Sequence, residues 1–357
     1  MPGCRERRSV PGPKRPVFGD HMPMPIAISP SAAPWRVCVA PMMDWTDRHC
    51  RYFHRLLSPH ARLYTEMVTS AALVRGGQLR LLEHSQQEHP VALQLGGSEP
   101  EELAQAAVFG AQAGYDEINL NVGCPSDRVQ SGRFGACLML DPGLVGQCVR
   151  AMRDAVQAAG SSVPVTVKCR IGVDDQDAYA DLQRFTEAMV EAGVQVLVVH
   201  ARKAWLQGLS PKENREIPPL DYDRVYRLRQ EFAGLTVVIN GGITTVPQVR
   251  QHLQSVDGVM LGRAAYHDPF LLAELEAALY GEPLPTREGV LNHLRPYVEA
   301  ELARGTALKH ITRHLLGLYQ GQPGARAFRR VLSEGAHRPG AGWSLLEEAM
   351  DPVRAAA

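Results

Sequence analysis

The chain has 357 residues, of which 45% are hydrophobic and 21% charged, so it can build two domains or one large domain with an appendage. This composition excludes wholesale disorder, and the length excludes a disulfide-stapled miniprotein. Lys plus Arg (38) equal Asp plus Glu (38), so the overall charge neither favours nor excludes a polyanionic partner.

Residues 1–30 are predicted to form a disordered basic extension, because basic residues lie there among Pro and Gly without the apolar segment of a secretory signal. No apolar run approaches the ~20 residues that a transmembrane helix needs. The seven cysteines are widely spaced and form no CxxC pair, which argues against a disulfide framework and a zinc module. A reducing cytoplasm fits this pattern best.

After residue 36, short apolar segments alternate with amphipathic segments, a pattern typical of a parallel sheet covered by helices. We predict strands at 37–41, 62–65, 91–95, 117–121, 165–169, 196–200, 236–240 and 258–261. Helices are predicted at 47–57, 69–73, 100–113, 142–158, 177–192, 221–232 and 246–254. These units predict an α/β fold, a (β/α)8 TIM barrel, over residues 31–282.

Beyond Asp268-Pro269 no strand-like run follows, and the pattern becomes helical from about residue 287 to 332. We therefore expect a C-terminal all-helical domain over residues 283–340 and a tail over 341–357. Residues 285–334 contain eight Lys or Arg against four Glu. Arg326 and Arg329 share a helix face there, and such a run is either a solvated surface or a nucleic-acid contact.

In barrels of this class the reacting groups follow the carboxyl ends of the strands. Gly241, Gly242 and Gly262 with Arg263 follow the last two strands, where backbone N–H groups and a guanidinium fit a phosphate, although each glycine pair also fits a tight turn. Lys168 can be a cation that lies beside an electron-rich ring, or it can be a surface residue at the end of its strand.

Gln94 and His200 stand at the carboxyl ends of two predicted strands. Gln94 can bind ring carbonyls and nitrogens, or it can be a satisfied polar residue at a sheet edge. His200 is either a core histidine or a donor to a ring or phosphate. The residues that end most of the strands together imply one large ligand.

Cys124 stands between Gly and Pro in the loop after the fourth strand, where its thiol can be a nucleophile, a metal ligand or a proton donor. No second Cys or His lies nearby at ligand spacing, so no metal site is expected. No Cys-His-Asn signature supports acyl chemistry. A general acid remains, and a structural loop thiol is the alternative.

Several motifs stand in the order of one known family: 40–49 (APMMDWTDRH), 94–97 (QLGG), 119–126 (NLNVGCPS), 167–172 (VKCRIG), 200–205 (HARKAW) and 240–243 (NGGI). Over about residues 35–335 the chain resembles the tRNA-dihydrouridine synthases. Residues 128–139 (RVQSGRFGACLM) and the stretch beginning at His200 resemble the A subfamily more than its relatives.

The resemblance implies FMN held in the barrel, NADPH as the electron source, and reduction of the C5=C6 bond of uridine in the D-loop of tRNA at positions 20 and 20a. It implies a hydride to C6 and a proton from Cys124 to C5. The implied FMN contacts are Pro41, Met42, Met43, Gln94, Lys168, His200, Asn240, Gly241, Gly242, Gly262 and Arg263.

The resemblance further implies that tRNA is bound by Asn121, Lys212, Arg215, Arg326 and Arg329. The protein is then expected to be a cytoplasmic monomer without a metal. Two rival hypotheses remain. One is a flavin barrel that reduces a free pyrimidine, similar to dihydroorotate dehydrogenases, for which the basic helical region has no use. The other is an RNA-binding protein without turnover, against which Cys124 and Lys168 argue.

Overall fold

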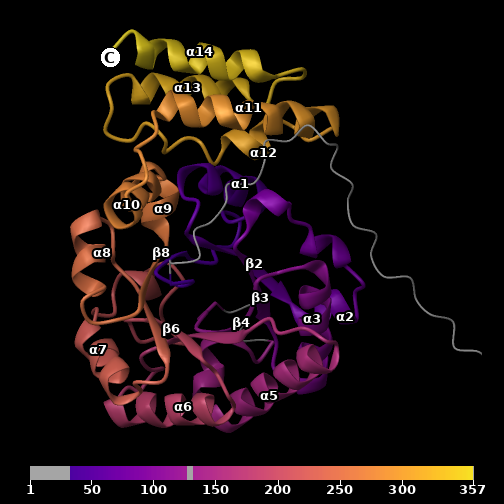
Figure 1. Cartoon of the computed structure of the whole chain (residues 1–357), viewed down its shortest axis with the longest axis vertical. Coiled ribbons are helices and arrows are strands. Elements are labelled where there is room, and N and C mark those ends of the chain that lie inside the picture. The colour runs from indigo at the N-terminus through magenta and orange to yellow at the C-terminus, as the bar shows by residue number, and fades with distance from the viewer. Residues whose placement is uncertain (1–32, 127–131, 357) are drawn as a thin grey trace, which may run out of the picture.

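The computed structural model describes residues 33–126 and 132–356. Its centre is a closed barrel of parallel strands in which each strand pairs with the next and β8 pairs with β1 (Figure 1). The strands are β1 (Val37–Val39), β2 (Arg62–Thr69), β3 (Val91–Gly96), β4 (Glu117–Val122), β5 (Val165–Arg170), β6 (Val196–His200), β7 (Thr236–Asn240) and β8 (Gly258–Leu261). This order confirms the predicted (β/α)8 barrel. The expectation for residues 1–30 lies outside the described residues.

Helices surround the barrel. They are α1 (Arg48–Leu57), α2 (Ser70–Val74), α3 (Pro100–Ala113), α5 (Pro142–Ala158), α6 (Tyr179–Glu191), α7 (Tyr222–Glu231), α8 (Val246–His252), α9 (Arg263–His267) and α10 (Phe270–Tyr280). Short 3-10 turns lie at Leu79–Leu82, Gln86–Glu88, Gly135–Leu140 and Glu213–Arg215. Side chains cap several helix starts, and Asp47 accepts from the backbone N–H groups of His49 and Cys50 at 3.0 Å each.

Helices α9 and α10 and strand β2 differ from the sequence-based expectation. Helices α9 and α10 were not predicted, because after Asp268-Pro269 we expected a helical pattern only from about residue 287, whereas α10 begins at Phe270 with Pro269 as its N-cap residue. Strand β2 continues to Thr69 past an irregularity between Tyr64 and Met67, which hides the alternation of its side chains.

The inner surface of the barrel has an apolar side and a polar side. The apolar cluster consists of Cys38, Ala40, Tyr64, Ala92, Val196, Val198, Val238 and Met260. Strands β3, β4 and β5 also carry buried polar side chains, which alternate with buried apolar ones: Gln94, Glu117, Asn119, Asn121 and Thr166. Every second residue of a strand faces the same way. The row of inward-facing polar residues therefore continues to the carboxyl ends of these strands and the loops that follow them.

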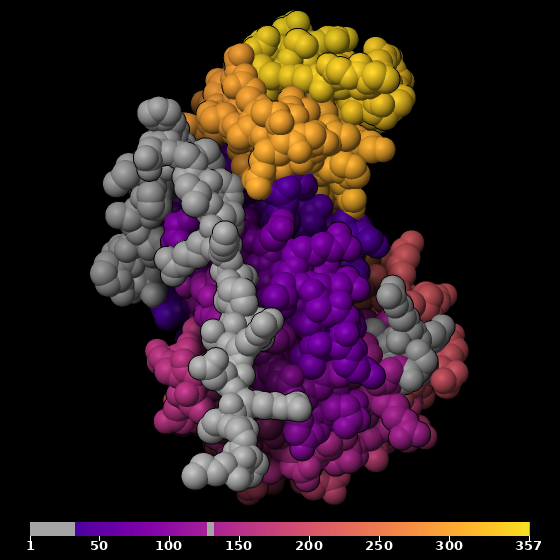
Figure 2. Space-filling model, turned by 90° about the vertical axis from the view of Figure 1, so that its right-hand side faces the viewer, coloured from indigo at the N-terminus to yellow at the C-terminus, as the bar shows by residue number. Residues whose placement is uncertain are grey.

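A layer of helices packs at one end of the long axis of the molecule, beyond α1 and α10 (Figures 1 and 2). It comprises α11 (Arg287–Ala303), α12 (Lys309–Thr312), α13 (Ala325–Gly335) and α14 (Trp343–Arg354). Helix α14 lies in the segment that we expected to be a tail, and its buried residues Leu346 and Met350 pack in the main core. It therefore belongs to the helical layer.

The helical layer is attached to α1 by polar contacts and by stacked aromatic rings. Arg48 donates to both carboxylate oxygens of Glu301, at 2.8 and 2.6 Å. The Nδ1 atom of His49 lies 2.7 Å from the hydroxyl of Tyr297, and the ring of Tyr52 stacks on Tyr297 with the centroids 3.9 Å apart. Because α1 follows the first strand-end loop directly, the layer is tied to the mouth of the barrel.

Buried histidines predict how stability depends on pH. Burial lowers the pKa of His49 to about 4 and of His54 to about 3, and it lowers the pKa of His200 well below its usual value. Above about pH 6.5 these rings are neutral in both the folded and the unfolded protein. Below that pH the rings of the unfolded chain bind protons that the folded protein does not bind. Each ring therefore contributes a slope of up to about 1.4 kcal/mol per pH unit.

We expect the urea midpoint of unfolding to fall steadily from about pH 7 to about pH 5. His310 is exposed, so His310→Gln should leave this profile unchanged. Equal midpoints at the two pH values would contradict the burial of neutral histidines.

Candidate active site

A cavity of about 530 Å³ opens where the carboxyl ends of the barrel strands meet. All of the residues expected to hold a cofactor line it: Pro41, Met42, Met43, Gln94, Lys168, His200, Asn240, Gly241, Gly242, Gly262 and Arg263. Asn121, Cys124 and Arg215 line it too. Lys212, Arg326 and Arg329 are not among the lining residues. The closed barrel thus brings together strand ends that lie far apart in the sequence.

Cys124 lies in the loop after β4 and is partly exposed to the cavity. Its backbone N–H donates to Asn121 Oδ1 at 3.0 Å, and its carbonyl oxygen accepts from the N–H of Ala136 at 2.9 Å. Its Sγ atom lies 3.5 Å from Ser126 Oγ. The thiol is free, and its backbone is fixed on both sides, so it can transfer a proton to a group bound in the cavity.

Cations dominate the wall formed by β5 and β6. Lys168 Nζ donates to Asn240 Oδ1 at 3.1 Å, and burial, with Arg170 nearby, lowers its pKa to about 8. Burial also lowers the pKa of Arg170 to about 10. The ring of His200 is neutral, because burial and then the charges of Arg170 and Lys168 lower its pKa. This wall can stabilise negative charge on a bound ligand.

The glycines after β7 have conformations that other residues rarely adopt. Gly241 and Gly242 have φ angles of 118° and 70°. A Cβ atom at Gly241 would lie 2.7 Å from the His200 ring, and one at Gly242 would lie 2.5 Å from Leu220. At Gly262 the space is open, since a Cβ would meet only Ala40, at 3.9 Å. Backbone can therefore approach a phosphate closely at this end of the cavity.

Arg263 pairs with Glu216 in this structure, at 2.5 Å between Nη1 and Oε1. A phosphate at the glycine turns would share the guanidinium with that carboxylate or displace it. Arg202 is a second guanidinium close by: Nη1 donates to the carbonyl oxygens of Glu216 and Pro218, and its Nε is buried without a hydrogen-bond partner among the described residues. Arg202 is not among the residues that line the cavity.

The rim after β1 is partly apolar. Met42 and Met43 line the cavity, and Met43 is 53% exposed. Trp45 also lines it and stacks on Tyr266, with the ring centroids 4.4 Å apart. Arg313 of the helical layer donates to the carbonyl oxygen of Asp44, so that layer contacts the rim directly.

The residues expected to bind tRNA are spread over two regions. Arg215 lines the cavity mouth, and Lys212 is exposed beside it at the start of the same 3-10 turn. Arg326 and Arg329 lie on α13 of the helical layer, where Arg326 is exposed and Arg329 donates to Gln320 Oε1 at 3.3 Å. A ligand touching both regions must span the barrel mouth and the helical layer.

Sequence reasoning missed several residues that line the cavity, among them Trp45, Met67, Arg170 and Thr244. Arg170 had a usable signal, because it stands two residues after Lys168 on one strand and so faces the same way. Its Nε donates to the carbonyl oxygen of Gly123 at 2.8 Å, next to Cys124. No sequence signal indicated Met67, since the irregularity in β2 conceals the direction in which its side chain points.

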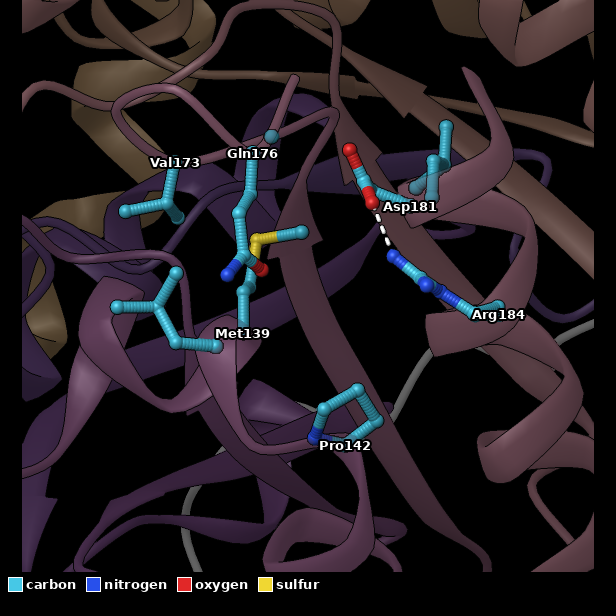
Figure 3. Close-up of a pocket in the computed structure, with 9 residues that line it drawn as sticks. Met139, Pro142, Val173, Gln176, Asp181 and Arg184 are labelled. Atoms are coloured by element: carbon cyan, nitrogen blue, oxygen red, sulfur yellow. Dashed lines mark hydrogen bonds and ion pairs between the residues drawn. The ribbon is translucent and has the colours of Figure 1, made fainter. Parts of the chain in front are cut away.

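A second cavity, of about 250 Å³, lies beside the loop after β5 (Figure 3). It is lined by Met139, Leu140, Pro142, Gly172, Val173, Gln176, Asp181, Leu182 and Arg184. Figure 3 shows that Asp181 and Arg184 pair with each other at one side. It shares no lining residue with the larger cavity and brings no nucleophile or unpaired charge together, so the chemistry belongs to the larger one.

No helix among residues 33–126 and 132–356 is both long and apolar enough to cross a membrane. Within the same ranges no three His, Cys, Asp or Glu side chains are placed to hold a metal ion.

A closed parallel barrel with a cationic cavity and a free thiol at its strand ends defines a TIM-barrel enzyme. Comparison with known proteins gives the family. A family model described as dihydrouridine synthase matches residues 38–354, and the chain belongs to this family.

Several similar proteins carry the name tRNA-dihydrouridine(20/20a) synthase. The protein from Xanthomonas axonopodis pv. citri is 62% identical over 320 residues, which cover 90% of this chain and 94% of that protein. The protein from Xylella fastidiosa is 59% identical over 320 residues, covering 89% and 95%. The protein from Vibrio cholerae is 56% identical over 321 residues, covering 89% and 96%.

Proposed function

We propose that this protein reduces the C5=C6 bond of uridine to 5,6-dihydrouridine at positions 20 and 20a in the D-loop of tRNA, with FMN as cofactor and NADPH as electron donor. We further propose that it acts as a monomer in the cytoplasm. The observation that supports this most is one cavity that combines Cys124, Lys168, Gln94 and Asn121 in a barrel of the dihydrouridine synthase family.

The cavity has the donor set that FMN requires. The amides of Gln94 and Asn240 can bind the polar edge of the isoalloxazine, and Met42 supplies apolar surface. Lys168 can offset the negative charge of a reduced ring. The turns at Gly241 and Gly262, with Arg263, suit the phosphate. FMN held by these residues would supply, after reduction by NADPH, the hydride for C6 of the uracil.

In this proposal Cys124 supplies the proton. Addition of a hydride to C6 leaves an enolate-like negative charge at C5 and O4, and transfer of the thiol proton to C5 completes the single bond. The thiolate that remains regains its proton from solvent. Arg170 and Lys168 lie close enough for their charges to interact with that thiolate. Asn121, beside the thiol, is proposed to contact the target nucleotide.

The target uridine must leave its stack to enter the cavity, which costs a few kcal/mol. Contacts with the tRNA backbone can offset this cost. We propose that Lys212 and Arg215 at the mouth and Arg326 and Arg329 on α13 provide them. All four are basic, and three are exposed.

The direct test uses purified protein loaded with FMN and given NADPH. Unmodified tRNA transcript should accelerate NADPH oxidation and gain dihydrouridine, whereas free uridine monophosphate should do neither. Turnover of the free nucleotide at a rate similar to tRNA would favour a small-molecule pyrimidine reductase. Binding of tRNA without any NADPH-dependent product would favour an RNA-binding protein.

The double variant Arg326→Ala/Arg329→Ala is expected to weaken tRNA binding without releasing FMN. Each lost phosphate contact should reduce the slope of log K against log salt by about 0.9. Filter binding across a salt series and the flavin absorbance of the same samples measure both effects. Arg184→Ala is the control, because Arg184 is an exposed arginine already paired with Asp181. An unchanged salt slope in the double variant would remove α13 from the tRNA interface.

A further inference from the structure

A continuous chain of hydrogen bonds runs through the polar side of the barrel to the active-site cavity. Thr166 Oγ1 donates to Glu117 Oε1 at 2.5 Å, and Asn119 Nδ2 donates to Thr166 Oγ1 at 2.8 Å. Gln94 Nε2 donates to Asn119 Oδ1 at 2.9 Å, and Asn121 Nδ2 donates to Gln94 Oε1 at 2.9 Å. Glu117, Asn119 and Thr166 are fully buried, and only Gln94 and Asn121 line the cavity.

Every donor in this chain points toward Glu117. Both carboxylate oxygens accept: Tyr64 donates to Oε1 at 2.8 Å, Trp35 Nε1 donates to Oε2 at 2.7 Å, and Arg62 Nη1 lies 3.3 Å from Oε2. Since a carboxylate so surrounded only accepts, the hydroxyl of Thr166 must donate to it. That hydroxyl then accepts from the next amide, and the same reasoning orients each amide in turn.

The upper end of the chain holds the loop that carries the thiol. Asn121 Oδ1 accepts from the backbone N–H groups of Gly123 and Cys124, both at 3.0 Å. If Asn119 were flipped, Gln94 and Asn121 would have to flip with it, and the NH2 group of Asn121 would then face two N–H donors. Buried polar groups left unpaired are costly, so the chain has one favourable direction.

We propose that Glu117 is a positioning residue, which fixes the direction of the amides of Asn119, Gln94 and Asn121 and thereby holds the backbone of Cys124 at the cavity. This inference rests on the proposed function only for its consequence, which is a thiol kept in place for proton transfer. The hydrogen-bond chain itself is a property of the protein without ligand.

The test is hydrogen exchange of the Gly123 and Cys124 amides by NMR in the protein without FMN or tRNA. Thr166→Val cuts the chain yet leaves the contacts of Glu117 with Trp35, Arg62 and Tyr64. We expect these two amides to lose protection by at least about fivefold. We also expect the side-chain NH2 signals of Gln94 and Asn121 to split into two sets.

Thr186→Val is the matched control. Thr186 is also a fully buried threonine, but its hydroxyl donates only to the carbonyl oxygen of Leu182 in its own helix, at 2.8 Å. We expect this variant to lose one buried hydrogen bond as well, and to keep the protection of both amides and one set of NH2 signals for each side chain. Equal effects in the two threonine variants, or no effect in either, would overturn the proposal.

Glu117→Gln tests the origin of the direction, because a glutamine amide can both donate and accept. We expect the same splitting and loss of protection as in Thr166→Val, while Tyr64→Phe, which removes one donor beside the chain, should change neither. If Glu117→Gln does not fold, Thr166→Val decides alone. Folded Glu117→Gln protein with normal protection would overturn the role of the carboxylate.

The outcome is separable from the proposed function. If the wild-type protein fails to reduce tRNA but Thr166→Val loses protection, the hydrogen-bond chain stands and the proposed function falls. If reduction occurs but protection is unchanged, the function stands and the positioning role of Glu117 falls.

Discussion

Replacing Cys124 with alanine is expected to lower the rate of tRNA reduction by at least about 10²-fold, because general acids contribute about 10² to 10⁴. FMN binding and reduction of the flavin by NADPH should stay near wild type, since the thiol is not among the groups proposed to hold the cofactor. Single-turnover reduction of tRNA by pre-reduced protein measures the step that should fail. Flavin absorbance and NADPH consumption without tRNA measure FMN binding and flavin reduction, which should stay near wild type.

Cys137→Ala is the matched control for this experiment. Cys137 is also partly buried and free, but it lies on the 3-10 turn after β4 with its Sγ directed to the carbonyl oxygen of Phe134 at 3.2 Å. It does not line the cavity, and its removal should leave the rate unchanged. A Cys124→Ala protein that reduces tRNA at the wild-type rate would assign the proton to another donor.

Replacing Lys168 with methionine should lower the rate of flavin reduction by NADPH by about 10²-fold or more, on the scale seen when one charge-stabilising group is removed from a buried site. Methionine retains much of the apolar length of lysine but has no charge. The partly buried ammonium donates to Asn240 and lines the cavity, where it can offset the charge of a reduced ring. Stopped-flow measurement of flavin bleaching gives this rate directly.

The pH dependence of flavin reduction provides a second test of the role of Lys168. Burial lowers its pKa to about 8, so the ammonium loses its proton as the pH rises through that value. The wild-type rate of flavin reduction should therefore fall above about pH 8, and the residual rate of Lys168→Met should lack this fall. Lys203→Met is the control, since Lys203 pairs with Asp177 outside the cavity. A flat wild-type profile would contradict the role of the charge.

Much of the barrel and its site could be predicted from sequence because the signals are local. Strands such as β6, β7 and β8 are short apolar runs between helical segments, and their bounds agree with those expected from the sequence. Parallel closure then brings all carboxyl ends to one face. Cys124 and Lys168 therefore line the same cavity, although they come from two different β/α units.

The remaining features depend on contacts between distant segments. The pair of Arg263 with Glu216 joins the loops after β8 and β6, and nothing near either residue indicates it. Helix α14 is stabilised by packing against the other helices of the helical layer. Its sequence alone does not indicate this packing, so the segment was expected to be a tail. The direction of the amide chain requires the register in which Gln94 lies beside Asn119 and Asn119 beside Thr166.

The most direct test of the proposed function is site-resolved mass spectrometry of tRNA from cells that lack this protein. We predict uridine in place of dihydrouridine at positions 20 and 20a, and its restoration by the wild-type protein but not by Cys124→Ala. Dihydrouridine at its normal level at both positions in such cells would contradict the proposal.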